Sequence, residues 1–128
     1  MIGAEAVGGD GLPTSFSTRG PHVALCAPGE RVRSLGLTGY KDVNGTSFAA
    51  PFVAATAALM VALGNRRSTA LSSQDVRNLL VRSATPFPGA PVSGCGSGVL
   101  DAAAALRALD AWIDQTVPGT RGDVEDDD

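Results

Sequence analysis

One stretch of this chain limits the possible folds more than any other. Residues 44–54 read NGTSFAAPFVA, and an alanine-rich apolar segment continues from there to Leu63. Apolar residues that follow a flexible Gly-Thr turn over this length predict a buried helix. Ser47 would then lie at the N-terminus of that helix.

A serine in this position is suited to acyl transfer. The first N–H groups of a helix have no partner within the helix, and the helix dipole is positive there. They would stabilise an oxyanion that develops beside Ser47. The alternative is that Thr46 or Ser47 only caps a core helix, because both residue types are favoured caps. Pro51 argues against an ordinary helix, because a proline inside a helix removes one backbone hydrogen bond.

The segment GTSFAAP, residues 45–51, resembles the active-site serine motif of the subtilisin-like serine proteases (peptidase family S8, the subtilases), Gly-Thr-Ser-x-Ala-x-Pro. Other segments resemble parts of the same family in the same order: MIGAEAV at 1–7, SFSTRG at 15–20, HVALCAPG at 22–29 and GSGVLDA at 96–102. The resemblance runs from Met1 to about Leu109, which is most of the chain.

The resemblance implies an α/β fold, namely the C-terminal part of the subtilisin-like three-layer fold, with parallel strands flanked by helices. Residues 1–112 would form this part of the protease domain, and residues 113–128 an acidic, disordered tail. The implied activity is serine-type endopeptidase activity, through an acyl-enzyme on Ser47, whose N–H contributes to the oxyanion hole. Thr46 would lie near the oxyanion, and Gly45 would provide the turn geometry.

The family's aspartate and histidine motifs, Asp-Ser/Thr-Gly and His-Gly-Thr-His, do not occur in these 128 residues. His22 is the only histidine, and it falls in the loop before a strand, so we do not expect it to be the base. We therefore expect a partial domain that lacks the triad Asp and His and is nearly inactive alone. Its partners would be a polypeptide substrate and the missing N-terminal part of the domain or a complementing chain.

A second hypothesis comes from a different class of function. The chain would be a non-catalytic fragment or interaction module that pairs with another subunit. Strands and helices cut from a larger parallel sheet leave an apolar face and an unpaired strand edge, which favours such pairing. Labelling of Ser47 by a serine-directed fluorophosphonate separates the two hypotheses.

Composition excludes several other classes. The net charge is −3 and the basic residues are scattered, so we expect no nucleic-acid partner. The longest apolar run, residues 52–63, is too short for a membrane span, and the N-terminus does not read as a signal peptide. No organic cofactor is implied, and no cluster has the spacing of a metal site. The family is largely exported, so secretion is the expected localisation of a complete member.

The two cysteines, Cys26 and Cys95, leave two alternatives open. They would be free thiols, one in a strand and one in a glycine-rich turn. Otherwise a disulfide would tie that strand to the later loop, as suits an exported protein. Sequence alone does not decide between them, because pairing requires Cα atoms within about 7 Å.

The remaining pattern predicts the order of the elements. Strands are expected at residues 2–7 and 23–27, with a short extended piece and a turn within 31–40. The central helix would cover residues 47–63 and stop at Gly64-Asn65. Ser72 or Ser73 would cap a second helix that has Asp75 in its first turn. A long irregular loop would follow at 83–98, then a last helix from Leu100 or Asp101 to about Trp112.

Overall fold

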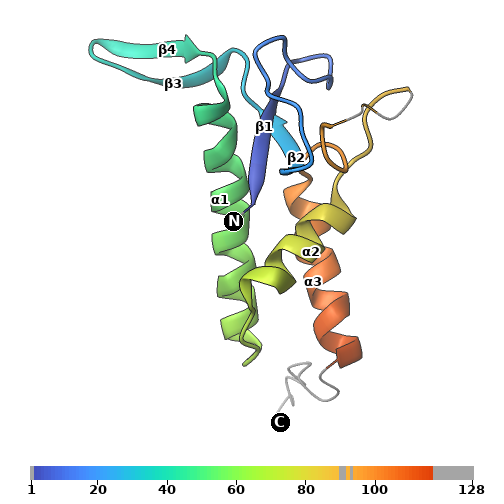
Figure 1. Ribbon diagram of the computed structural model, residues 1–128. Helices are drawn as coiled ribbons and strands as arrows, with labels where there is room; N and C mark the ends of the chain where they lie inside the picture. The colour runs from blue at the N-terminus through green and yellow to red at the C-terminus, as the bar shows by residue number, and fades with distance from the viewer. Residues whose placement is uncertain (1, 90–91, 93, 117–128) are drawn as a thin grey trace.

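The computed structural model describes residues 2–89, 92 and 94–116 (Figure 1). Its elements, in chain order, are β1 (Gly3–Val7), β2 (Val23–Pro28), β3 (Val32–Gly36), β4 (Gly39–Val43), α1 (Thr46–Arg66), α2 (Ser73–Ser83) and α3 (Ala102–Thr116). The predicted tail falls partly on α3, which extends four residues past Trp112 and buries Ile113. Residues 117–128 lie outside the described part of the chain.

The centre of the fold is a parallel pair of strands. β1 and β2 pair in parallel, and the other edge of β2 is lined by residues 98–100. There the Cys26 N–H donates to the Gly98 carbonyl at 2.8 Å, and the Leu100 N–H donates to the Cys26 carbonyl at 2.7 Å. Helix α1 packs against both strands, while α2 and α3 pack against each other and against α1. This arrangement confirms the α/β prediction.

One stripe of α1 forms the middle of the hydrophobic core. The buried residues of this helix recur every three or four positions, which places them on a single face: Ala49, Val53, Thr56, Met60 and Gly64. They pack with residues of β2, α2 and α3, of which Leu25, Leu80 and Leu109 have no exposed surface. The sheet and the three helices therefore share one core.

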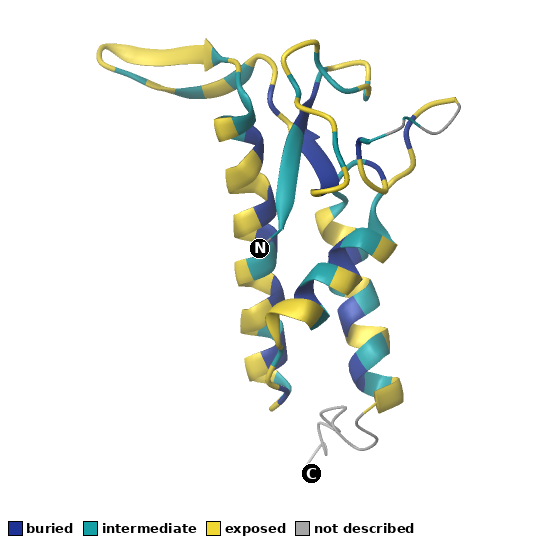
Figure 2. Cartoon of the chain, viewed as in Figure 1, coloured by how far each residue is buried: buried dark blue, intermediate teal, exposed yellow. Residues whose placement is uncertain are grey.

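The prediction that α1 is a buried helix is wrong for its outer face. Phe52 is 41% exposed, Leu59 55% and Val61 42%, and Figure 2 shows the outer side of α1 as largely exposed. The sequence of α1 is apolar on all sides of the helix. It therefore does not indicate which side of the helix packs against the core and which side lacks a neighbour. Among the described residues, the large apolar side chains that are exposed on helices all belong to α1: Phe52, Leu59 and Val61.

Helix α1 also differs from the prediction in length. It continues through Gly64-Asn65 to Arg66. Gly64 is buried where the chain turns back, and a Cβ there would lie 2.8 Å from the Thr69 carbonyl oxygen. The glycine therefore permits close packing rather than ending the helix. At 21 residues α1 is long and apolar enough to cross a membrane by length and composition, contrary to the sequence expectation, although apolar core helices share that property.

The shorter elements follow local sequence signals. Ser72 caps α2, its hydroxyl accepts from the Asp75 N–H at 3.0 Å, and the Asp75 carboxylate accepts from the Ser72 N–H at 2.9 Å. This capping box confirms the predicted start of α2. Strand β4 was missed by the sequence analysis. It pairs antiparallel with β3, and the two form a hairpin that projects beyond the N-terminal end of α1 (Figure 1).

Candidate active site

The turn before α1 positions Ser47. Gly45 is the N-cap residue, with φ 147° and ψ 157°, and no side chain caps the helix. This backbone conformation is essentially restricted to glycine, which explains the residue at this position. Because the hydroxyls of Thr46 and Ser47 do not cap α1, the capping alternative does not describe this helix.

Backbone contacts from the end of β2 hold the turn in place. The Gly45 N–H donates to the Gly29 carbonyl at 2.8 Å, and the Arg31 N–H donates to Asn44 Oδ1 at 2.7 Å. A Cβ at Gly29 would lie 2.4 Å from Ala6 Cβ and 2.9 Å from the Gly45 carbonyl oxygen. Gly29 is thus required for the close approach of the turn to the sheet. The sequence analysis missed the positioning role of Asn44.

Ser47 lies on the first turn of α1 with its side chain exposed. Among the described residues, no group accepts a hydrogen bond from its hydroxyl, and the first turn holds no acidic residue. Pro51 has no N–H, so the Ser47 carbonyl lacks the donor that residue i+4 normally supplies. Ser47 therefore has a free hydroxyl at the positive end of the helix dipole. No charged side chain occurs from Val43 to Asn65, that is, in the turn and along the helix up to the residue before its last.

Thr46 and Gly45 flank this hydroxyl in the chain. Thr46 is partly buried, and the described residues offer its hydroxyl no hydrogen-bond partner either. A Cβ on Gly45 would approach the Phe48 ring no closer than 3.5 Å, so space does not forbid a side chain there. The need for glycine comes from the backbone angle alone.

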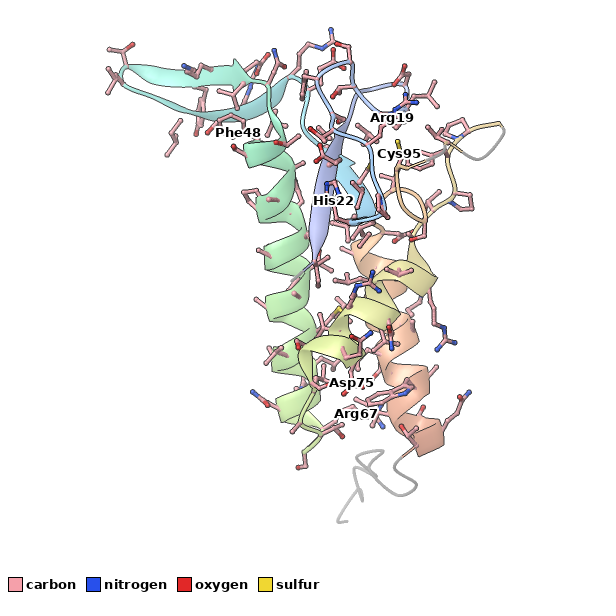
Figure 3. All side chains as sticks on the ribbon, viewed as in Figure 1. Arg19, His22, Phe48, Arg67, Asp75 and Cys95 are labelled. Atoms are coloured by element: carbon pink, nitrogen blue, oxygen red, sulfur yellow. The ribbon has the colours of Figure 1, made fainter. Side chains whose placement is uncertain are left out.

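The structure brings no base to Ser47 within the described residues. His22 is exposed in the turn that precedes β2, while the Gly29–Gly45 contact lies beyond the other end of that strand. Seven residues at about 3.3 Å each put roughly 20 Å between His22 and Gly29. A general base must come within about 3 Å of the hydroxyl. Figure 3 labels His22 beside the strands and Phe48 at the first turn of α1.

An apolar pocket of about 360 Å³ lies beside the first two turns of α1. The hairpin and the helix line it together through Val32, Ser34, Phe48, Pro51, Phe52 and Ala55. Ser47 is not among the lining residues, so the pocket is adjacent to the hydroxyl rather than built around it. Ser34 is the one side chain in this lining that can form a hydrogen bond. The pocket is therefore suited to bind apolar side chains.

Titratable groups with shifted pKa values lie away from Ser47. Burial raises the pKa of the Cys26 thiol to about 11, with smaller contributions from Cys95 and Glu5. At the other end of α1, the hydrogen bond to Asp114 is the main cause of a raised pKa of Arg67. In the described part of the chain, no three His, Cys, Asp or Glu side chains gather in a way that could hold a metal ion.

Comparison with known proteins gives a consistent result. The sequence profile of the subtilase family matches residues 1–104. An extracellular protease of Xanthomonas campestris is 34% identical over 116 residues, which cover 84% of this chain and 20% of that protein. An extracellular basic protease of Dichelobacter nodosus is 36% identical over 116 residues, covering 84% of this chain and 19% of that protein.

Solved structures agree with these relatives. The patellamide maturation protease PatA superposes with a TM-score of 0.74 at 33% identity, covering 84% of this chain and 42% of PatA. The protease MycP1 superposes with a TM-score of 0.68 at 33% identity, covering 82% of this chain and 35% of MycP1. The chain thus spans about a fifth of the two extracellular proteases and less than half of these solved structures.

Proposed function

Because the chain belongs to the subtilase family of serine proteases, we propose that it carries the nucleophile of a serine endopeptidase, Ser47. One observation carries the proposal: the Ser47 hydroxyl is exposed and unpartnered among the described residues, on the first turn of α1. This hydroxyl is open to a substrate, and its place in the GTS motif at a helix N-terminus separates it from other exposed serines such as Ser68.

The reaction is hydrolysis of a peptide bond in two steps. Ser47 Oγ attacks the scissile carbonyl while a histidine takes its proton and returns it to the leaving amine. The Ser47 N–H stabilises the oxyanion, assisted by the positive end of α1 and by Thr46 beside it. Water then hydrolyses the acyl-enzyme and frees Ser47. Gly45 keeps the turn in the geometry that presents the hydroxyl.

The base and its aspartate come from another polypeptide segment. Such a segment has a surface to occupy, because Phe48, Phe52 and Leu59 share one side of α1 with Ala55, at spacings of three and four residues. This ridge begins one residue after Ser47, so a helix packed on it lies next to the hydroxyl. Without the base we expect a loss of about 10²–10⁴-fold in rate, so the chain alone is nearly inactive.

The substrate class and location follow from the family. Relatives of this chain are extracellular proteases. We propose polypeptide as the substrate and secretion as the localisation of the complete enzyme.

The test is labelling of Ser47 by a fluorophosphonate probe. The chain is examined alone and after mixing with the part of a subtilase relative that carries the Asp and His motifs. We expect background labelling alone and a rise of at least about 100-fold in the mixture. The rise is lost in Ser47→Ala and kept in Ser68→Ala, an exposed serine outside the site. No rise in a mixture that has formed a complex would refute the proposal.

The exposed ridge of α1 also favours the second candidate, a non-catalytic module that pairs with another subunit. Exposed apolar surface on a helix marks an interaction site whether or not catalysis follows. Phe52→Asp should prevent association in both cases, whereas Ala103→Asp on exposed α3 surface should not. Association without any Ser47 labelling would select the non-catalytic module.

A further inference from the structure

The two cysteines lie together although they are 69 residues apart in the sequence. Cys26 lies in β2, and Cys95 lies in the loop that leads into residues 96–100. Cys26 is 0% exposed and Cys95 2%. Both belong to a small apolar cluster that also contains Val7 and Phe87, separate from the main core. Figure 3 labels Cys95 beside the upper end of β2.

Backbone hydrogen bonds fix the segment of Cys95 along β2. The Ser97 N–H donates to the Ala24 carbonyl at 3.0 Å, and the Cys26 N–H donates to the Gly98 carbonyl at 2.8 Å. Gly96 is so close to β2 that a Cβ on it would lie 2.4 Å from the Ala24 carbonyl oxygen. The Cys26 Sγ itself lies 3.6 Å from the Cys95 carbonyl oxygen and donates to it. The thiol of one cysteine is therefore in contact with the backbone of the other.

We propose that Cys26 and Cys95 form a disulfide when the protein meets a small-molecule disulfide oxidant such as oxidised glutathione. One cysteine thiolate attacks the oxidant, forms a mixed disulfide and releases one glutathione thiolate. The second cysteine thiolate then attacks the protein sulfur of that mixed disulfide and releases the other. The two protein thiols lose two protons and two electrons, and the oxidant becomes two thiols.

The bridge would tie β2, whose C-terminal end contacts the serine turn, to the segment that carries Cys95. Cys26 precedes by three residues Gly29, whose carbonyl accepts from the Gly45 N–H. The loop closed by the bridge contains the hairpin, α1 and α2. A loop of this length gives a large entropic stabilisation, because the unfolded chain loses many conformations. The proposal does not depend on the chemistry of Ser47.

Burial determines when the bridge forms. The raised pKa of Cys26 keeps its thiol protonated at neutral pH, and the thiolate is the reactive form. Cys26 also faces the Cys95 thiol and the Glu5 carboxylate, and both disfavour a thiolate there. Oxidation is therefore expected during folding or during local opening of the segment 94–98 that carries Cys95, rather than in the closed, reduced protein.

The test measures how strongly the fold favours the bridge. The 128-residue chain is equilibrated with reduced and oxidised glutathione, in native buffer and in concentrated urea. The bridged fraction is then read by mass after alkylation. In urea the effective concentration of the two thiols should be on the order of mM, as for any flexible chain. In native buffer we expect a value at least about 100-fold higher.

A matched variant places the second thiol elsewhere. In the double variant Cys95→Ser and Ser68→Cys, the new thiol follows Arg67, at the opposite end of the molecule from Cys95 (Figure 3). Its effective concentration should be no higher in native buffer than in urea. The wild-type comparison needs no variant to fold: equal effective concentrations in the two conditions would overturn the proposal. A wild-type increase shared by the double variant would also overturn it.

Discussion

The two ends of helix α1 are built differently. At its C-terminal end, the Arg67 guanidinium lies 2.9 Å from Asp110 Oδ1 and 2.6 Å from Asp114 Oδ1, and Ser72 and Asp75 cap the helix that follows. At its N-terminal end, no side chain caps the helix, Phe52 is exposed and Ser47 has no described partner.

The β3–β4 hairpin, at the same end of the molecule as Ser47, also exposes large apolar side chains. Leu35 is 78% exposed, Tyr40 76%, and Leu37 is fully exposed at its tip. Helices α2 and α3, by contrast, bury their large apolar side chains in the core, among them Leu80, Leu109 and Ile113. The serine-bearing end leaves the Ser47 hydroxyl without a described partner and Phe52 and the hairpin leucines exposed, which is what the proposed function requires of a surface that another segment covers.

The largest expected effect is the loss of a buried leucine, compared with the loss of an exposed leucine on another helix. Leu109 of α3 is fully buried, and Leu59 on the outer side of α1 is 55% exposed. Leu109→Ala should lower the free energy of unfolding by about 2–5 kcal/mol, because it leaves a cavity. Leu59→Ala should change it by less than about 0.5 kcal/mol. Urea unfolding measures both, and similar losses would mean that α1 has no open face.

The second prediction concerns pH and the buried thiol of Cys26. Its pKa is raised from an ordinary 9.0 to about 11, chiefly by burial, so the folded state holds the proton more tightly than the unfolded state. The stabilisation is complete below about pH 9 and is lost as the pH rises through 11. Under reducing conditions the loss should be about 2–3 kcal/mol relative to Cys26→Ala. Parallel pH profiles of the two proteins would contradict this environment.

The third prediction concerns the serine turn. Gly45→Ala should lower the free energy of unfolding by about 1–3 kcal/mol, because φ 147° is unfavourable for a residue with a side chain. Gly39→Ala, at φ 140° in the exposed hairpin with open space around its Cα, is the matched control for backbone strain alone. The two losses should be similar, because the backbone angle alone requires glycine at position 45, and no loss in Gly45→Ala would contradict this.

The smallest expected effect on the free energy of unfolding concerns Ser72, the N-cap of α2. Ser72→Ala should lower the free energy of unfolding by about 1 kcal/mol, because the Asp75 N–H loses its acceptor. Ser72→Thr keeps a hydroxyl and should recover most of this loss. Thermal unfolding of the two variants is sufficient to compare them, and a silent Ser72→Ala would show that water replaces the cap.

Local signals made much of the fold predictable. The start of α2 follows from Ser72 and Asp75, which satisfy each other's backbone N–H groups within four residues of sequence. The end of α1 was mispredicted because Gly64 has the sequence appearance of a helix stop, whereas its role depends on Thr69 packing against it. Such a contact is tertiary, and no local pattern contains it.

In the candidate site, too, the features set by local sequence were predictable and those set by tertiary contacts were not. The position of Ser47 at a helix start was predicted from the residues around it. The outer face of α1 was not predicted, because an apolar run does not state which of its sides has a neighbour. The role of Asn44 was missed for a related reason: its partner, the Arg31 N–H, lies 13 residues away across the hairpin.

Whether Ser47 is a nucleophile is decided by the rate of its fluorophosphonate labelling when the chain is complexed with a subtilase segment that supplies the Asp and His motifs. The account predicts covalent modification at residue 47, identified by peptide mass, at least about 100-fold faster than in the chain alone. It also predicts that Ser47→Ala abolishes labelling without changing the midpoint of unfolding. A complex that forms and leaves Ser47 unmodified would contradict it.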